Sequence, residues 1–450
     1  MDQITDSALV ALAGLIGVVA LLFLAVTRFR WHVFIALVLP ILLLGLLPGI
    51  DRKAFIAAFE QGFGRTLQSI GVVIVLGCIM AEALKHTGAI ERITLTMIRW
   101  VGKPRMPLAL TLSGWVVGIP IFSDIGYVVM NPLLHAAALE TGLNMAVIST
   151  GLIGACMLTH AIVPPTPGPL AAVALLQADM GKVIVLGLLV TFIAQFAGYA
   201  YALWVGPRLE SPPSRDFVGV SFRDRGLESA LPSTWRSYAP ILIPLGLIAG
   251  QGFAGFLLPE DHVIRRALLY LGWPVVALGI GVLLAYSNAR PEHAKSRTGE
   301  WVEDGLRNAA MMLMVTGLGG SLSQILRQTP AIDVVVQAIT ATPIPVVFLP
   351  FILAVIGNLI TGSATVGVIT SATITAPLLD QIGLSPEAAV LAAGSGCIIV
   401  KYVNSSYFWV CTSLSRMPLR SALIAISGVT FINGMSAMAV VYVMWLLGVV

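Results

Sequence analysis

Two stretches of the sequence place polar and helix-breaking residues inside apolar segments. The first, THAIVPPTPGP from Thr159 to Pro169, contains four prolines beside one histidine, His160. Proline removes a backbone donor and clashes with the preceding turn, so a continuous helix cannot form there. The second, VKYVNSSYFW, places Lys401 and several hydroxyl and amide side chains in a similar setting. Both stretches predict a break that exposes backbone groups to a ligand.

Two further interruptions lie elsewhere in the chain. GIPIFSDIGY, Gly118 to Tyr127, contains Asp124, and GNLITGSATVG spans Gly357 to Gly367. Each is expected to be the tip of a re-entrant hairpin or the gap of a broken helix. Irregular backbone of this kind is tolerated at membrane depth only where protein buries it or a watery cavity lines it.

Converging breaks can bind an anion without special side chains. Half-helix N-termini present free N–H groups and a partial positive charge, and small residues let the backbone approach a ligand closely. The predicted ligand is therefore small, anionic and polyhydroxylated, although any one hydroxyl could instead bond to its own helix. The predicted substrate-binding residues are Ser123, Asp124, Thr159, His160, Thr166, Gly168, Thr361, Gly362, Ser363, Thr365, Lys401, Asn404, Ser405 and Ser406.

Ionisable side chains in apolar segments are costly and are functional candidates by default. Asp124 and His160 are the predicted carriers of a coupling proton, since histidine titrates near neutral pH. The structural alternatives are an Asp124–Lys401 ion pair and a histidine that only packs between helices. Glu82 and His135 are weaker candidates.

Lys401 aligns with His160 in an internal repeat, described below, at a shift of 241 residues. An ammonium at this position could pair with a substrate carboxylate. It could also occupy the place that a coupling cation would otherwise fill.

The composition requires a membrane setting for these residues. The chain has 450 residues, of which 57% are hydrophobic and 11% charged, and its mean hydropathy is +0.92. Ala8 to Thr27, Val183 to Val205 and Ala422 to Val443 are each long enough to span a bilayer. The four cysteines have no metal-ligand spacing, so neither a metal nor a cofactor is expected. The net charge of +4 reflects basic loops rather than a nucleic-acid partner.

The chain contains a duplication. LGCIMAEALKHTGAIERI from Leu76 aligns with LGGSLSQILRQTPAIDVV from Leu318, and the register continues to Cys156 and Cys397. The first repeat is assigned to residues 1–206, with scaffold helices in 8–65 and transport elements in 66–206. Residues 207–236 form a cytoplasmic linker, expected to be a plain solvated connector. The second repeat covers 237–450, with transport elements in 305–420.

Most of the 26 basic residues fall on one side if each half has about five transmembrane helices, a re-entrant hairpin and a broken helix. The positive-inside rule then places both termini in the periplasm. An odd number of crossings inverts the second half relative to the first, and inverted repeats are typical of transporters. The predicted fold is therefore an all-α polytopic membrane protein with two inverted-topology repeats.

These residues resemble the gluconate permease family of bacterial proton-coupled symporters. THAIVPPTPGP is similar to the family's Thr-His…Pro-Pro-x-Pro-Gly-Pro run, and QADMGKV, GSATVGVIT, VNSSYFW and FGRTLQSIGVVIVLG also match family segments. The resemblance implies an inner-membrane importer of gluconate-like sugar acids driven by protons. It also implies an elevator-type architecture, in which a substrate-carrying domain moves against a homodimeric scaffold.

The chain departs from the family's pattern at the predicted site. Thr166 replaces the family's histidine and Asp124 its glutamate, while Tyr402 and Ser405 replace a histidine and an aspartate and Thr361 a glutamine. Lys401, directly before Tyr402, is a lysine that the family's pattern lacks. The family includes carriers of glycerate-like acids and D-serine, so these replacements leave the substrate open.

The sequence thus predicts a secondary importer of a small hydroxylated carboxylate by proton symport. Another small anion or amino acid is the alternative, as is sodium coupling through carbonyls at Gly362 to Thr365. A channel fits paired broken helices less well. An intramembrane enzyme would need a nucleophile–base pair or a His-Glu-x-x-His metal motif, which the sequence lacks. The protein is therefore not expected to be an enzyme.

Overall fold

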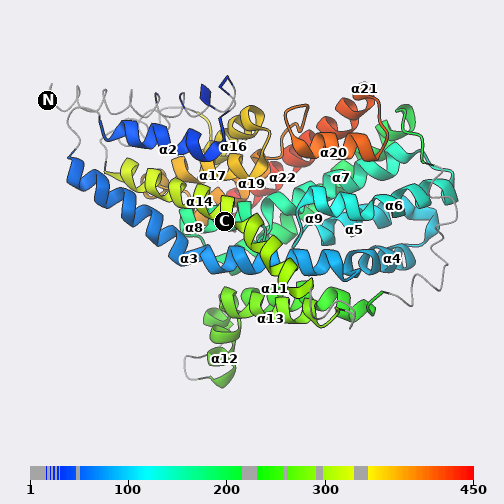
Figure 1. Cartoon of the computed structure of the whole chain (residues 1–450), viewed down its shortest axis with the longest axis horizontal. Coiled ribbons are helices and arrows are strands. Elements are labelled where there is room, and N and C mark those ends of the chain that lie inside the picture. The colour runs from blue at the N-terminus through cyan, green and yellow to red at the C-terminus, as the bar shows by residue number, and fades with distance from the viewer. Residues whose placement is uncertain are drawn as a thin grey trace.

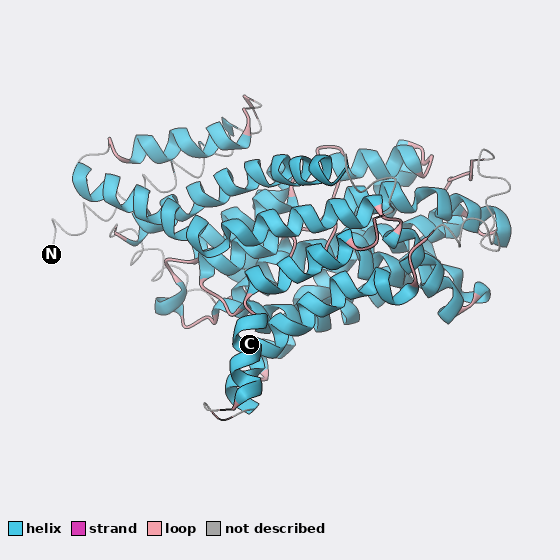
Figure 2. Cartoon of the chain, turned by 60° about the horizontal axis from the view of Figure 1, so that its bottom comes forward, coloured by secondary structure: helices cyan, strands magenta, loops and turns pink. Residues whose placement is uncertain are grey.

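The computed structural model consists of helices joined by turns and loops (Figures 1 and 2). It describes residues 31–46, 51–214, 231–257, 262–289, 297–328 and 343–450, with Pro259 and isolated positions between 17 and 29. Within these ranges no residue lies in a strand, which confirms the all-helical prediction. Apolar segments must satisfy their own backbone hydrogen bonds in a bilayer, and a helix does so within one segment.

The described helices are connected in chain order by turns and loops. They are α2 (Val33–Leu44), α3 (Arg52–His86), α4 (Ala89–Val101), α5 (Met106–Val117), α6 (Ser123–Thr141), α7 (Met145–Ile162), α8 (Pro167–Leu176), α9 (Met180–Val205), α11 (Thr234–Leu257), α12 (Val263–Leu271), α13 (Pro274–Tyr286), α14 (Arg297–Arg327), α16 (Phe348–Thr361), α17 (Ala364–Thr375), α18 (Leu379–Ile382), α19 (Pro386–Gly396), α20 (Ser406–Leu414), α21 (Leu419–Ala422) and α22 (Gly428–Leu446).

The two longest helices, α3 and α14, pack against each other in antiparallel directions (Figure 1). Their backbones approach so closely that a Cβ at Gly62 would collide with Gly320, and one at Gly305 would lie 2.7 Å from a side-chain carbon of Ile79. Lipid tails are as apolar as helix surfaces, so helices in a bilayer gain no hydrophobic driving force for association. Small residues instead let them associate through close van der Waals packing. We call α3 and α14 the long-helix pair.

Five described helical segments are long and apolar enough to cross a membrane. A bent pair, α12 and α13, would add a sixth span, with 70° between its two parts. The five are Arg52–His86, Met145–Leu176, Met180–Arg208, Gly299–Arg327 and Leu419–Leu446. The predicted first span, Ala8 to Thr27, lies largely outside the described residues.

Each of the four predicted interruptions contains a non-helical segment. Residues 118–122 separate α5 from α6, 163–166 separate α7 from α8, 362–363 separate α16 from α17, and 397–405 separate α19 from α20. The hydrophobic window of Met145–Leu176 is buried entirely inside the protein, whereas the other four windows are 44–67% buried. The proline break is thus surrounded by protein, as its unpaired backbone groups require.

The start of the linker differs from the solvated connector that the sequence suggested. Ser211 and Ser214 are buried, Ser211 Oγ donates to the carbonyl of Ser415 at 2.6 Å, and the Ser214 amide donates to His135 Nδ1 at 3.0 Å. The segment after α9 is therefore fastened to α6 and to the turn after α20. Residues 215–230 of the predicted linker lie outside the described part of the chain.

Candidate functional site

A cavity of about 330 Å³ lies where the interruptions meet. Its volume is in the range of small-molecule sites. Its wall combines the start of α6, the end of α7, the α16–α17 turn and the segment before α20. The predicted residues that line it are Ser123, Asp124, His160, Thr361, Gly362, Ser363, Thr365, Lys401, Asn404, Ser405 and Ser406.

Three predicted residues are not on the cavity wall, and each has a packing or hydrogen-bonding role. Thr159 donates its hydroxyl to the carbonyl of Ala155 at 3.2 Å, within its own helix. The Thr166 hydroxyl lies within hydrogen-bond distance of two carbonyls exposed by the proline break, those of His160 at 2.7 Å and Val163 at 2.9 Å. Gly168 packs against α17, since a Cβ there would lie 3.6 Å from Thr365 Cα.

Lys401 extends its ammonium group to the C-terminal end of α16. Its Nζ donates to Asn358 Oδ1 and, at 3.3 Å, to the carbonyl of Gly362. The side chain is only 2% exposed. A cation is favoured at this position because carbonyl oxygens at a helix C-terminus carry partial negative charge.

The backbone of Lys401 is also held in place. Its amide donates to Thr430 Oγ1 at 3.0 Å, and its carbonyl accepts from Ser427 Oγ at 2.6 Å, so the end of the helical segment before α22 and α22 itself position it. Among the described residues no carboxylate forms an ion pair with Lys401, Asp124 included. A buried ammonium is stabilised by an opposite charge, and a ligand carboxylate in the cavity would supply one.

The α16–α17 turn fits against the segment before α20. Gly362 has φ +74, which favours glycine, and a Cβ there would collide with the carbonyl of Asn404. The Asn404 amide and the Tyr402 hydroxyl both donate to the carbonyl of Leu359, at 2.9 and 2.7 Å. The carbonyls at the end of α16 are therefore satisfied from the opposite interruption, which joins the two as one unit.

His160 and Asp124 face the cavity from the first half of the chain. The imidazole lines the cavity together with the Asp124 carboxylate and the Lys401 ammonium, and its ring centroid lies 5.5 Å from that of Phe122. His160 Nδ1 is buried without a hydrogen-bond partner among the described residues. An unsatisfied buried ring nitrogen next to a cavity is available to a ligand or to a proton.

Helix N-termini also point to where an anion would sit. Both α17 and α20 begin at the cavity, with Ser363 and Ser405 as their N-caps. First-turn N–H groups lack acceptors within their own helix, and of those in α17 the Val366 amide donates to Ser363 Oγ at 3.4 Å. Asp124 already occupies the first turn of α6, so an anionic ligand is favoured at α17 and α20, on the side of Lys401.

Sequence reasoning missed several residues of the site. Asn358 binds the Lys401 ammonium and donates to the carbonyl of Ile399 at 2.8 Å. Its signal was available, since it is the one amide in the apolar helix FLPFILAVIGNLIT. Met157 and Tyr407 also line the cavity, but nothing in their local sequence distinguishes them from packing residues.

No group of three or more His, Cys, Asp or Glu side chains in the described ranges could hold a metal ion.

Comparisons with known proteins agree with the geometry. A family model of GntP family permeases matches residues 9–448. A gluconate permease of Pseudomonas aeruginosa is 32% identical over 405 residues, covering 89% of each chain. An L-idonate transporter of Escherichia coli is 28% identical, covering 87% of this chain and 89% of the relative. A D-serine transporter of Escherichia coli is 30% identical, covering 94% and 95%.

Two solved structures share the fold at low sequence identity. Neisseria gonorrhoeae MtrF superposes with a TM-score of 0.60 at 14% identity, covering 89% of this chain and 85% of that one. The Alcanivorax borkumensis YdaH transporter gives 0.61 at 16% identity, covering 89% and 90%. The relatives are permeases and transporters rather than enzymes, as expected from the sequence. With its family match and its apolar helices, this chain belongs to the GntP family of permeases and is a multi-pass membrane transport protein.

Proposed function

We propose that the protein is a secondary active transporter that imports a small hydroxylated carboxylate, of the gluconate type, by proton symport. The observation that carries this proposal is the buried Lys401 ammonium, which lines the cavity without a carboxylate partner in the described structure. A substrate carboxylate there would also meet the N-termini of α17 and α20. Three favourable electrostatic contributions then act on one charged group.

The remaining polar groups suit a hydroxylated chain. Ser363, Ser406 and Asn404 lie on the same wall as Lys401 and are at least partly exposed to the cavity. Hydroxyl and amide side chains both donate and accept, so they fit sugar-acid hydroxyls in either orientation. The carboxylate would therefore bind at Lys401, with the hydroxylated carbons directed toward these residues.

Asp124 and His160 are proposed to carry the coupling proton. Both side chains line the cavity together with Lys401. A proton bound at this pair would reduce the negative charge in the cavity when an anion is also present. Proton and anion would then bind more tightly together than either does alone, as symport requires.

Alternating access is proposed to occur by an elevator motion of two inverted repeats. The hairpin-like pairs α5–α6 and α16–α17 and the interrupted helices α7–α8 and α19–α20 would form the moving part. The long-helix pair would stay fixed within a homodimer, which moves residues 66–86 and 305–327 from the transport elements of the sequence prediction to the scaffold. The proposed location is the inner membrane, and the basic loops favour an orientation with both termini in the periplasm.

A second substrate class is favoured by one specific comparison. The D-serine transporter is 30% identical and is covered over 95% of its length, so an amino acid or a glycerate-like acid is the alternative substrate. An amino acid would still place its carboxylate at Lys401, while its ammonium would face Asp124. Sodium coupling is less favoured because Lys401 already places a cation on the carbonyl of Gly362. A channel or an intramembrane enzyme is less favoured still.

Reconstituted protein tests the proposal. Counterflow of labelled gluconate is competed with idonate, glycerate and D-serine, with and without Na⁺. In separate vesicles that contain no substrate, an internal pH dye reports proton movement during net gluconate uptake. We expect saturable, Na⁺-independent exchange and acidification coupled to uptake. Absence of exchange with every carboxylate in the panel would refute the substrate assignment, and uptake without acidification would refute the proton symport.

A further inference from the structure

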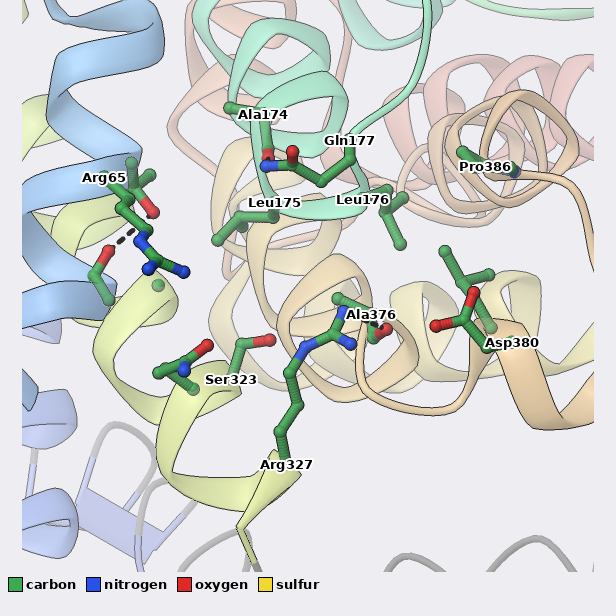
Figure 3. Close-up of a pocket in the computed structure, with 15 residues that line it drawn as sticks. Arg65, Ala174, Leu175, Leu176, Gln177, Ser323, Arg327, Ala376, Asp380 and Pro386 are labelled. Atoms are coloured by element: carbon green, nitrogen blue, oxygen red, sulfur yellow. Dashed lines mark hydrogen bonds between the residues drawn. The ribbon is translucent and has the colours of Figure 1, made fainter. Parts of the chain in front are cut away.

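A second and larger cavity, of about 470 Å³, lies away from Lys401. It lies between the long-helix pair, the C-terminal ends of α8 and α17, and helices α18 and α19 (Figure 3). Two guanidinium groups line it, Arg65 from α3 and Arg327 from α14. Asp380 is the one carboxylate among the residues that line it, so the charged side chains of the wall carry a net positive charge.

Among the described residues, most N–H donors of these two arginines have no acceptor. Arg327 donates from Nη2 to the carbonyl of Ala376, the C-cap of α17, at 2.6 Å. Arg65 has no hydrogen bond and no ion pair with any residue that the structure describes. Each guanidinium carries five N–H donors in a geometry that matches a carboxylate, so the cavity retains a large donor capacity.

Neutral groups complete the wall. Ser323 and Gln324 lie on α14 one turn before Arg327, and Gln177 caps the end of α8 across the cavity. Hydroxyl and amide groups beside two guanidinium groups repeat the chemistry of the Lys401 cavity, with a cation for the carboxylate and neutral polar groups for hydroxyls.

The two cavities lie at opposite ends of the same helix. Thr365, in the first turn of α17, lines the Lys401 cavity, whereas Ala376, which caps its end, lines the arginine cavity. Twelve helical residues place these ends roughly 18 Å apart. Gly168 packs against Thr365 at the end of α17 that lines the Lys401 cavity.

We propose that the arginine cavity is a second, weaker binding site for the carboxylate that the protein transports. The inference rests on the proposed function, because it takes the substrate to be a small hydroxylated carboxylate. In the orientation predicted from the basic loops, Arg65 and Arg327 are on the periplasmic side, where basic residues are otherwise disfavoured. The cavity is therefore where an imported anion binds first, before the transport elements move.

The test uses Arg65→Gln, Arg327→Gln and the double variant in proteoliposomes. Arg52→Gln is the matched control, because Arg52 lies on the same helix and outside the cavity. We expect the double variant to lower kcat/KM for gluconate uptake by roughly 10-fold at low ionic strength, mainly through KM. The difference should shrink near 1 M salt, where charges are screened within about 3 Å.

A purely structural role of Arg327 as a cap of α17 would not depend on salt in this way. Arg65→Gln removes no hydrogen bond or ion pair within the described structure, so this variant tests the proposal even if the double variant does not fold. Arg65→Lys should restore most of the lost kcat/KM. Equal KM values for wild type, Arg65→Gln and the double variant at low salt would overturn the second site.

Equilibrium binding of labelled gluconate to purified protein separates this inference from the proposed function. We expect two classes of site in the wild type, and loss of the weaker class in the double variant. If gluconate binds through the arginines but is not transported, the proposed function fails and the second site stands. If gluconate is transported and binds to a single class of site, the second site fails alone.

Discussion

Replacing Lys401 with glutamine removes the ammonium from the cavity while keeping a polar side chain of similar width. In the proposed complex the ammonium makes a charge-assisted hydrogen bond to the substrate carboxylate. Losing such a bond costs about 1.5–3 kcal/mol, which is a factor of roughly 10 to 100 in affinity. We therefore expect Lys401→Gln to raise KM for gluconate uptake by about that factor.

The same substitution has two opposing effects on stability. Asn358 Oδ1 and the carbonyl of Gly362 lose their donor, which destabilises the fold. Removal of a buried charge without a carboxylate partner stabilises it. We therefore expect Tm without substrate to change by about 4 °C or less, so that a loss of uptake cannot be attributed to unfolding.

Two measurements decide the outcome, substrate uptake and the rise in Tm with gluconate concentration. A ligand stabilises the folded state by RT ln(1 + [L]/Kd), so weaker binding moves the rise in Tm to higher gluconate concentrations. Lys53→Gln is the control, because Lys53 is exposed at the start of α3 and outside the cavity. Unchanged KM and an unchanged Tm response in Lys401→Gln would refute the assignment of the carboxylate to this ammonium.

Three further predictions concern the turn, the proton and the break. Gly362→Ala forces a Cβ onto the carbonyl of Asn404 at positive φ; we expect loss of folded protein in size-exclusion chromatography, and a normal yield would contradict the close packing. Asp124→Asn should retain gluconate counterflow but lose accumulation driven by a pH gradient, and accumulation equal to wild type would exclude Asp124 as a proton carrier. His160→Asn should also retain counterflow and lose accumulation driven by a pH gradient, and it should shift the pH dependence of uptake. Thr166→Val removes the hydroxyl beside two carbonyls of the break and should lower stability by about 1–3 kcal/mol without changing KM, whereas Thr166→Ser should remain close to wild type in denaturant unfolding.

Much of the site could be predicted from local sequence because helix breaks have local causes. Proline in the 163–166 segment prevents a continuous helix, and glycine next to serine in GSAT favours a turn followed by a capped helix. The structure places all four interruptions where the sequence predicted them. Lys401 was identified by its charge in an apolar segment, which is also a local signal.

Contacts between distant segments could not be predicted in this way. Asn358 and Lys401 are 43 residues apart, and neither neighbourhood indicates that their side chains meet. The sequence predicts Thr166 as a ligand-binding residue because it interrupts an apolar segment. In the structure its hydroxyl is within hydrogen-bond distance of two backbone carbonyls of the proline break. A single sequence does not show whether a polar group serves a ligand or the backbone, because both uses need the same atoms.

The complete enclosure of Met145–Leu176 bears on how the protein responds to different membranes. This segment carries the proline break and His160, and lipid does not reach its hydrophobic window. A change in bilayer thickness acts on helices that contact lipid, such as α9, whose window is 44% buried. The geometry of the break should therefore be insensitive to acyl-chain length, while transport rates that depend on outer helices vary with it. One protein can then keep a constant affinity for its substrate in membranes whose lipid composition changes with growth conditions.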